Sequence, residues 1–408
     1  MTKFRRKQVF EGIKIADFCW VGVGPIVMSY LADHGATVIH IESATRPEIL
    51  RTTPPFKDNI PGLNRSAYFA NFNNNKYGVT LNLNHPKAID IARGFVSWAD
   101  IIGEAFTPGT MDKWGLGYKD LVKIKPDIIM FSTCQQGQTG PWARQPAYGT
   151  QLVSLSGFTN LAGWPDRGPT GPFGAYTDSI APLFGVAGLV AALDYRRRTG
   201  KGQHLDLSQF EAGVHFEAPL LLDYFINGRV ASATGNRCPH AAPHGAYPCR
   251  GNNRWCTIAV FTDVEWHNFC HAIGDSEWTQ NSRFSTLLGR KENEDELDKL
   301  IAKWTLDFTS EEVMTKMQGV GVSAGVVQNM KDIHEDAQLE HRHYLWQLEH
   351  AEIGKHFYDG PPFKLSKTPC ELIMPAPCLG EHNEYVYGKI LGIPDKEFVE
   401  LLSEGVFD

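Results

Sequence analysis

Short β-branched runs and longer helix-forming runs alternate through the first third of the chain, and this order restricts the fold more than any other feature. Three runs are typical of strands, at 13–17, 37–41 and 127–132, and two are typical of helices, after Pro25 and at 88–98. A strand that returns through a helix to the same sheet makes a parallel pair. The order therefore predicts an α/β fold whose large domain holds a doubly wound, Rossmann-like parallel sheet.

The turn after the first predicted strand contains Gly22, Val23, Gly24 and Pro25 and opens the first predicted helix. Glycines in such a turn let the backbone approach a ligand closely, but the third glycine of the dinucleotide-binding fingerprint is missing. We therefore expect no nicotinamide cofactor here. The turn is instead expected to meet an anionic or carbonyl-bearing ligand with its N–H groups.

Asp178 lies just before an apolar, helix-forming run at 179–198 and follows a glycine-containing stretch at 171–174. A carboxylate at a helix start is held ionised by the free N–H groups and the positive end of the helix. Position alone leaves two interpretations open. Asp178 is either a structural N-cap or a nucleophile that attacks an activated carbonyl.

The middle of the chain has its own series of elements and predicts a smaller α+β domain at 235–332. An apolar helix at 208–227 precedes it. The predicted strands of the small domain lie at 245–249 and 254–260, and its helices at 265–273, 294–304 and 310–318. The large domain is then split in sequence, with 1–207 as its first part, 208–234 as a linker helix and 333–408 as the returning segment.

Charge and composition exclude several classes of protein. A net charge of −7 and a pI near 6.1 disfavour a nucleic-acid binder. The basic N-terminus lacks the apolar core of a signal peptide, and no run reaches the ~20 apolar residues of a membrane span. We therefore expect a soluble, cytoplasmic protein that contacts neither nucleic acid nor membrane. Eight scattered cysteines are typical of reduced intracellular thiols.

One group of residues resembles a set of zinc ligands: Cys238, His240, His244, Cys249 and Cys256. Their spacing matches no standard zinc site, and the prolines between them indicate an extended loop. We expect no metal site here. His240 and His244 are either surface residues or part of the lining of a substrate pocket.

Several motifs occur in a fixed order along nearly the whole chain. They are Glu-Gly-Ile-Lys-Ile-Ala-Asp-Phe at 11–18, Leu-Ala-Asp-His-Gly-Ala-Thr-Val-Ile-His-Ile-Glu at 31–42, Asn-Asn-Asn-Lys at 73–76, Pro-Gly-Thr-Met-Asp-Lys-Trp-Gly-Leu-Gly-Tyr at 108–118, Gly-Gln-Thr-Gly-Pro at 137–141 and Leu-Gly-Glu-His at 379–382. Together with the sequence around Asp178, they resemble the family III CoA-transferases of the formyl-CoA and carnitine CoA-transferase type. The resemblance implies two ring-like subunits that thread through each other, as a homodimer or as a hetero-oligomer with a related subunit.

The resemblance also implies roles for individual residues. Asp178 matches the nucleophile, which forms a mixed anhydride and then an aspartyl-CoA thioester. Coenzyme A thioesters are then substrates, with no permanently bound cofactor and no metal. The positions that match the CoA-binding residues of the family, or lie beside them, are Val21, Gly22, Val23, Leu81, Asn84, Ala105, Phe106, Thr107, Lys113 and Tyr148. The arginine of the family that follows Glu42 is Ser43 here, so Arg46 or Arg51 is expected to meet the phosphates with help from Lys76 or Lys113.

Departures from the family pattern bear on the substrate. The glutamine and the glutamate typical of formyl-CoA transferases are replaced by Gly22 and Gly149, which argues against formate and oxalate. The aromatic residues Trp20, Tyr148, Phe173 and Tyr176 favour a larger, partly apolar acid. Within the family, transfer from succinyl-CoA to benzylsuccinate in anaerobic aromatic degradation is the specific hypothesis.

Two alternatives remain. One is racemisation of a 2-methylacyl-CoA, which needs an acid/base pair across the α-carbon. The racemases place a histidine in a Gly-His-Asp step, where this chain has Ala147, Tyr148 and Gly149. The other alternative is an assembly subunit of a hetero-oligomeric transferase, although the presence of Asp178 argues against it.

Overall fold

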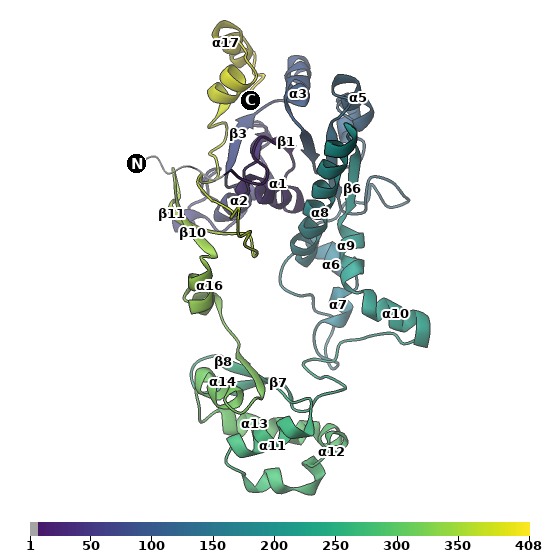
Figure 1. Ribbon diagram of the computed structural model, residues 1–408, viewed down its shortest axis with the longest axis vertical. Helices are drawn as coiled ribbons and strands as arrows, with labels where there is room; N and C mark the ends of the chain where they lie inside the picture. Colours follow the sequence, from purple (N-terminus) through teal and green to yellow (C-terminus); the bar gives the residue numbers. More distant parts are fainter. Residues whose placement is uncertain (1–6) are drawn as a thin grey trace. The chain divides into compact units, whose positions relative to one another are not determined.

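In the computed structural model, which describes residues 7–408, the chain divides into two compact units (Figure 1). The large unit consists of the described residues up to Phe158 together with Gly171–Val230 and Gln338–Asp408. The small unit consists of Thr159–Thr170 and Ala231–Ala337. The large unit is thus built from segments that lie on both sides of the small unit in sequence.

Six parallel strands form the sheet of the large unit in the order β3-β2-β1-β4-β5-β6. Their bounds are β1 (Lys14–Phe18), β2 (Thr37–Glu42), β3 (Lys76–Thr80), β4 (Ile101–Glu104), β5 (Ile129–Cys134) and β6 (His204–Ser208). This is the strand order of the doubly wound nucleotide-binding fold, in which the order reverses between the first and fourth strands. The predicted α/β fold with a parallel sheet is confirmed.

Helices cover both faces of this sheet (Figure 1). On one face Ile15 and Ile129 pack against Val27 and Leu189, and on the other Ala16 packs in a core with the helices that follow β3 and β4. Neighbouring strand residues point to opposite faces of the sheet, and helices cover both faces. Both kinds of position in the central strands are therefore buried, which explains their nearly continuous apolar runs. The helices of the first face are α1 (Val23–Asp33) and α8 (Tyr176–Thr199), and those of the second are α3 (Pro86–Trp98) and α5 (Tyr118–Ile124).

The remaining helical elements of the large unit are η1 (Ile49–Thr52), η2 (Lys57–Asn59), α2 (Ala67–Phe72), α4 (Thr110–Lys113), α6 (Gly149–Leu155), α9 (Gln209–Phe216), α10 (Ala218–Asn227), η5 (Tyr385–Ile390) and α17 (Asp395–Ser403). Two further short helices, α7 (Phe158–Leu161) and α16 (Ala337–Arg342), span the sequence boundaries between the units.

Helix α8 begins at Tyr176 rather than at 179, so Asp178 is the third residue of its first turn and not the N-cap. The sequence placed the helix start too late. The glycines of α8 pack against the sheet: a Cβ at Gly188 would lie 2.8 Å from Leu205 Cδ2 of β6, and a Cβ at Gly185 would lie 3.2 Å from Phe131 Cζ of β5. Although the sequence predicted no span, α8 is the one helix in the described part of the chain with the length and apolar content to cross a membrane. In this fold α8 is a helix of the core.

The helix expected over 208–227 is two helices, with a break at Glu217. Pro219 fits the first turn of α10, whereas inside a continuous helix its missing N–H would break the hydrogen-bond ladder. No residue of α10 is buried, and Phe225 and Ile226 are 74% and 78% exposed.

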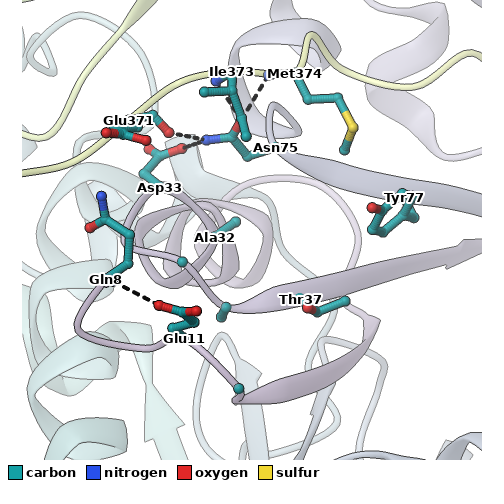
Figure 2. Close-up of a pocket in the computed structure, with 13 residues that line it drawn as sticks. Gln8, Glu11, Ala32, Asp33, Thr37, Asn75, Tyr77, Glu371, Ile373 and Met374 are labelled. Carbon is teal, nitrogen blue, oxygen red and sulfur yellow. Dashed lines mark hydrogen bonds between the residues drawn. The ribbon is translucent and has the colours of Figure 1, made fainter. Parts of the chain in front are cut away.

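The C-terminal segment packs on the large unit. Its hairpin, β10 (Leu345–His350) and β11 (Gly354–Asp359), lies beside α2. Further along, Asn75 accepts hydrogen bonds from the N–H groups of Ile373 and Met374 and donates one to Asp33 (Figure 2). These residues border a cavity of about 280 Å³ at the amino ends of β1 and β2 (Figure 2). Ligands of doubly wound sheets bind at the opposite edge, beyond the carboxyl ends of the strands.

The small unit has a three-stranded antiparallel sheet in the order β7-β8-β9, with helices packed against it. Its thiols Cys249 and Cys256 are buried and donate hydrogen bonds to the backbone oxygens of Tyr247 and Thr257. Among the described residues, no three of the five side chains considered as zinc ligands come close enough together to hold an ion. The elements are β7 (His244–Cys249), β8 (Arg254–Ala259), β9 (Ser323–Val326), α11 (Asp263–Ala272), η3 (Glu277–Gln280), η4 (Ser282–Phe284), α12 (Leu287–Glu292), α13 (Glu294–Thr305), α14 (Ser310–Gln318) and α15 (Met330–His334).

Candidate active site

A cavity of about 470 Å³ lies at the carboxyl ends of β1, β4 and β5. The chain leaves β1 and β4 toward opposite sides of the sheet, and this reversal opens a crevice between the loops that follow the two strands. The first turn of α8 and the loop that leads into α6 complete the wall. The lining residues are 20–24, 105–108, 133–135, 143–149, Gln151, Asp178 and Gln209.

The carboxylate of Asp178 is fitted between two glycines. A Cβ atom at Gly22 would lie only 2.7 Å from Asp178 Oδ2. A Cβ atom at Gly149 would lie 3.2 Å from Asp178 Oδ1 and 2.1 Å from the Cβ of Ala175. Both positions therefore require the absence of a side chain, and Gly149 has this role in addition to its place at the start of α6.

The electrostatic state of Asp178 suits a nucleophile. Burial raises the pKa of its carboxyl group to about 6. Within the described part of the chain, its side chain accepts no hydrogen bond. At neutral pH the group is mostly ionised, and its lone pairs are not engaged by neighbouring donors. A carboxylate in this state is more reactive toward a carbonyl carbon than a solvated one.

The turn between β1 and α1 supplies hydrogen-bond donors beside this carboxylate. Val21 has a φ of 73°, and its N–H donates to Glu48 Oε1 at 2.7 Å. The next three N–H groups, of Gly22, Val23 and Gly24, have no hydrogen-bond partner among the described residues. Free N–H groups at the start of the eleven-residue helix α1 are suited to stabilise a negatively charged oxygen.

A second nucleophile type lines the same cavity but is less suitable. Burial raises the pKa of Cys134 to about 11, so its thiol is protonated at neutral pH. Asp178 is therefore the best candidate nucleophile of the cavity.

Glu104 ends β4 and fixes the loop that follows, because it accepts hydrogen bonds from the Phe106 N–H at 2.9 Å and from Gln138 Nε2 at 3.2 Å.

The structure brings most of the residues predicted to bind CoA to this cavity. Those that line it are Val21, Gly22, Val23, Ala105, Phe106, Thr107 and Tyr148. Three others do not line it. Leu81 is buried in the core beneath α3, Asn84 is exposed in the loop before α3, and Lys113 is exposed at the end of α4.

Two basic residues expected to meet CoA phosphates are instead buried and paired, so that expectation is wrong for both. Arg51 is fully buried and binds both oxygens of Glu42, at 2.7 Å and 2.6 Å. Lys76 is fully buried and donates to Asp17 at 3.1 Å. Arg46 is exposed, and its contact with a phosphate remains a prediction.

Sequence reasoning missed the polar residues of the loop after β5 and of the start of α9. Among the described residues of the lining, Arg144 is the only cationic one, and Gln135 and Gln209 add amide groups. The available signal was position, since Arg144 follows the Gly-Gln-Thr-Gly-Pro motif in a loop at the ligand-binding edge of the sheet.

The fold and the cavity define an α/β enzyme, and comparison with known sequences specifies which kind. Residues 10–383 match the sequence model of CoA-transferase family III. The chain therefore belongs to that family, and the enzyme is a CoA-transferase that uses CoA thioesters as substrates.

Similar proteins include two from Chloroflexus aurantiacus. Succinyl-CoA–D-citramalate CoA-transferase is 28% identical over 406 residues, which covers 100% of both chains. The beta subunit of succinyl-CoA–L-malate CoA-transferase is 29% identical over 402 residues and 97% of both chains. Among solved structures, a CAIB/BAIF family protein from Brucella suis has a TM-score of 0.86 at 27% identity, over 94% of this chain and 100% of that one.

Proposed function

We propose that this enzyme transfers CoA from succinyl-CoA to a short dicarboxylic acid, with Asp178 as the covalent nucleophile. One observation carries the proposal: an ionisable carboxylate without a hydrogen-bond partner among the described residues lies between Gly22 and Gly149, beside free backbone N–H groups. The two similar Chloroflexus proteins have names that include succinyl-CoA and a dicarboxylate, which supports this choice of donor and acceptor.

The reaction proceeds through two kinds of intermediate. The Asp178 carboxylate attacks the thioester carbon of succinyl-CoA and expels the CoA thiolate, which gives a mixed anhydride. The thiolate then attacks the aspartyl carbonyl, releases succinate and leaves an aspartyl-CoA thioester. The acceptor carboxylate repeats these steps in reverse: it displaces the thiolate to form a second anhydride, and the thiolate attacks the acceptor acyl carbon, which releases the new acyl-CoA and restores the free Asp178 carboxylate. Each tetrahedral oxyanion is stabilised by the N–H groups of 22–24.

Polar groups of the lining suit an acceptor with a second carboxylate. Arg144 is placed to pair with an anionic group, and Gln135 and Gln209 are able to donate to carboxylate or hydroxyl oxygens. Such donors favour a short aliphatic dicarboxylate. Benzylsuccinate, the acceptor suggested by the aromatic residues, is a dicarboxylate too and belongs in the same test.

The test is mass spectrometry of products after incubation with succinyl-CoA and separate acids: malate, citramalate, glutarate, benzylsuccinate, and acetate as a monocarboxylate control. We expect acyl-CoA formation with at least one dicarboxylate at a kcat/KM at least about tenfold above that for acetate. The same assay in deuterated water distinguishes a CoA-transferase from a racemase, because α-proton exchange without CoA transfer would support a racemase. No histidine lines the described cavity, so we expect no such exchange.

We further propose that the enzyme is an obligate, interlocked dimer. Helix α10 has no buried residue within this chain although most of its residues are apolar, and a soluble helix of that kind needs a covering surface. Threaded chains would bury far more than the ~1,600 Å² of a typical reversible complex. The partner is either a second copy or a related subunit, as the beta-subunit name of one relative suggests.

Light scattering after size exclusion measures this directly. We expect a species of twice the 45.5 kDa chain mass that persists on dilution to nanomolar concentration, because threaded chains do not separate without partial unfolding. A folded monomer would contradict the proposal. Activity that requires a second, co-expressed polypeptide would identify a hetero-oligomer.

A further inference from the structure

We propose that Glu48 is a positioning residue for the reaction: it holds Val21 in the conformation that presents the 22–24 turn to Asp178. The inference deepens the proposed function and rests on it, because the turn is where the oxyanion would bind. Glu48 lies outside the cavity lining and is fully buried, so it acts through the backbone of Val21.

The conformation of Val21 needs an external restraint. Its φ of 73° lies in the left-handed region, which is unfavourable for a residue with two heavy atoms on Cβ. Its N–H donates to Glu48 Oε1 at 2.7 Å, a short, charge-assisted hydrogen bond. Strained backbone that persists next to a reactive group is held by the surrounding structure. Here the restraint comes from a carboxylate 27 residues further along the chain.

Glu48 is in turn fixed by a chain of fully buried charged groups. His40 Nε2 lies 3.2 Å from Glu48 Oε2, and His40 Nδ1 lies 3.2 Å from Asp17 Oδ2. Burial alone would lower the pKa of His40, but its hydrogen bonds to Asp17 and Glu48, together with the negative charges of Glu42 and Asp17, outweigh burial and raise the pKa to about 9. The protonated imidazole donates from both nitrogens and clamps the two carboxylates.

The same groups restrain the turn at two further points. Asp17 Oδ1 accepts the N–H of Cys19 at 2.9 Å, and Lys76 Nζ donates to the backbone oxygen of Pro25 at 3.0 Å. The backbone from Cys19 to Pro25 is therefore attached at its start, at Val21 and at its end. The N–H groups between the last two attachments, those of 22–24, are the ones without a partner in the described part of the chain.

A metal site at the same place is less consistent with the contacts. His40, Glu42 and Glu48 have ligand atoms within 4.8 Å of one another. However, Arg51 already binds both oxygens of Glu42, and Val21 and His40 bind the two oxygens of Glu48. With these groups paired inside the protein, the cluster is complete without an ion and serves to hold the turn.

A double-mutant cycle tests the proposal. Glu48→Ala removes the acceptor, and we expect kcat with succinyl-CoA to fall about 100-fold while KM changes less than about threefold, as for the loss of an oxyanion donor. Glu48→Gln keeps an oxygen that can accept from Val21 and should retain kcat within about tenfold. Glycine adopts a φ of 73° without steric cost, so Glu48→Ala in a Val21→Gly background should lower kcat less than about tenfold.

An equal loss of kcat in both backgrounds would overturn the proposal, because a purely structural role of Glu48 does not depend on the residue at 21. Crystal structures of Glu48→Ala and Glu48→Gln add a readout that needs no activity. We expect Val21 to leave the left-handed region in Glu48→Ala and to keep it in Glu48→Gln. An unchanged φ in Glu48→Ala would refute the positioning role. If treatment of the wild-type enzyme with succinyl-CoA and hydroxylamine gave no hydroxamate at Asp178, the proposed function would fail. The crystal structures would still decide whether Glu48 holds the conformation of Val21.

Discussion

Replacement of Asp178 by alanine is expected to lower kcat for CoA transfer by at least about 10³-fold, with the KM for the acyl-CoA changed less than about threefold. The covalent route has no substitute carboxylate, because Asp178 is the only Asp or Glu in the described lining and Cys134 is a protonated thiol at neutral pH. Folding should be preserved, since the side chain of Asp178 makes no hydrogen bond to the rest of the described chain.

Steady-state kinetics with succinyl-CoA, combined with peptide mass spectrometry after hydroxylamine treatment, checks this expectation. Wild-type enzyme should carry the hydroxamate on Asp178, and the alanine variant should carry none. Asp90→Asn is a matched control, because Asp90 is an exposed aspartate on α3 whose one ionic partner among the described residues is Arg93. More than about a tenth of the wild-type kcat in Asp178→Ala would exclude a covalent aspartate.

The same residue sets an expected pH dependence. Asp178 must be ionised to attack, and burial raises its pKa to about 6. Therefore kcat/KM should fall below that pH, by about tenfold for each further unit. The residual activity of Asp178→Ala should not show this fall of kcat/KM at acidic pH, and the loss of the pH dependence would identify Asp178 as the titrating group.

Replacement of Gly22 by alanine is expected to lower kcat by at least about 100-fold. The added Cβ would lie 2.7 Å from Asp178 Oδ2, so either the carboxylate or the turn must move. Both movements separate the nucleophile from the N–H groups of 22–24. A displacement on the scale of 1 Å is sufficient for a loss of this size.

Gly94→Ala is the matched control for this variant. Gly94 lies within α3, and a Cβ there would have only Leu391 Cδ1, at 4.0 Å, as a neighbour. Alanine should leave kcat unchanged and stabilise the helix by about 0.5–1 kcal/mol. Wild-type kcat in Gly22→Ala would show that the carboxylate does not need the space that the glycine leaves.

The sequence predicted the doubly wound sheet because β1, β2 and β5 are apolar runs separated by helix-forming segments. It did not predict β3, β4 or β6, for three different reasons. β3 starts with the buried Lys76 and contains Gly78, and β4 has only four residues. β6 is an edge strand with polar residues at alternate positions. Each of these becomes a strand through pairing with its neighbours, which local propensity does not express.

The candidate site was predictable where backbone signals and the family resemblance coincide, at the glycine turn after β1 and at Asp178. The roles of Arg51 and Lys76 were not predictable, because a charged side chain read from sequence alone is taken to be exposed. Their pairing with Glu42 and Asp17 depends on the alignment of β1, β2 and β3 in the sheet. Arg144 was missed because the direction of a loop is set by tertiary structure.

The proposed nucleophile and the groups proposed to bind the acceptor acid lie in separate segments of the chain. Asp178 belongs to α8, whose glycines lie against the sheet, and buried charged groups hold the turn after β1. The segment 135–148, in contrast, is a surface connection that brings Arg144 and Tyr148 to the cavity. Substitutions in this loop, in natural relatives or by design, are therefore expected to change the acceptor acid without moving Asp178 or the 22–24 turn.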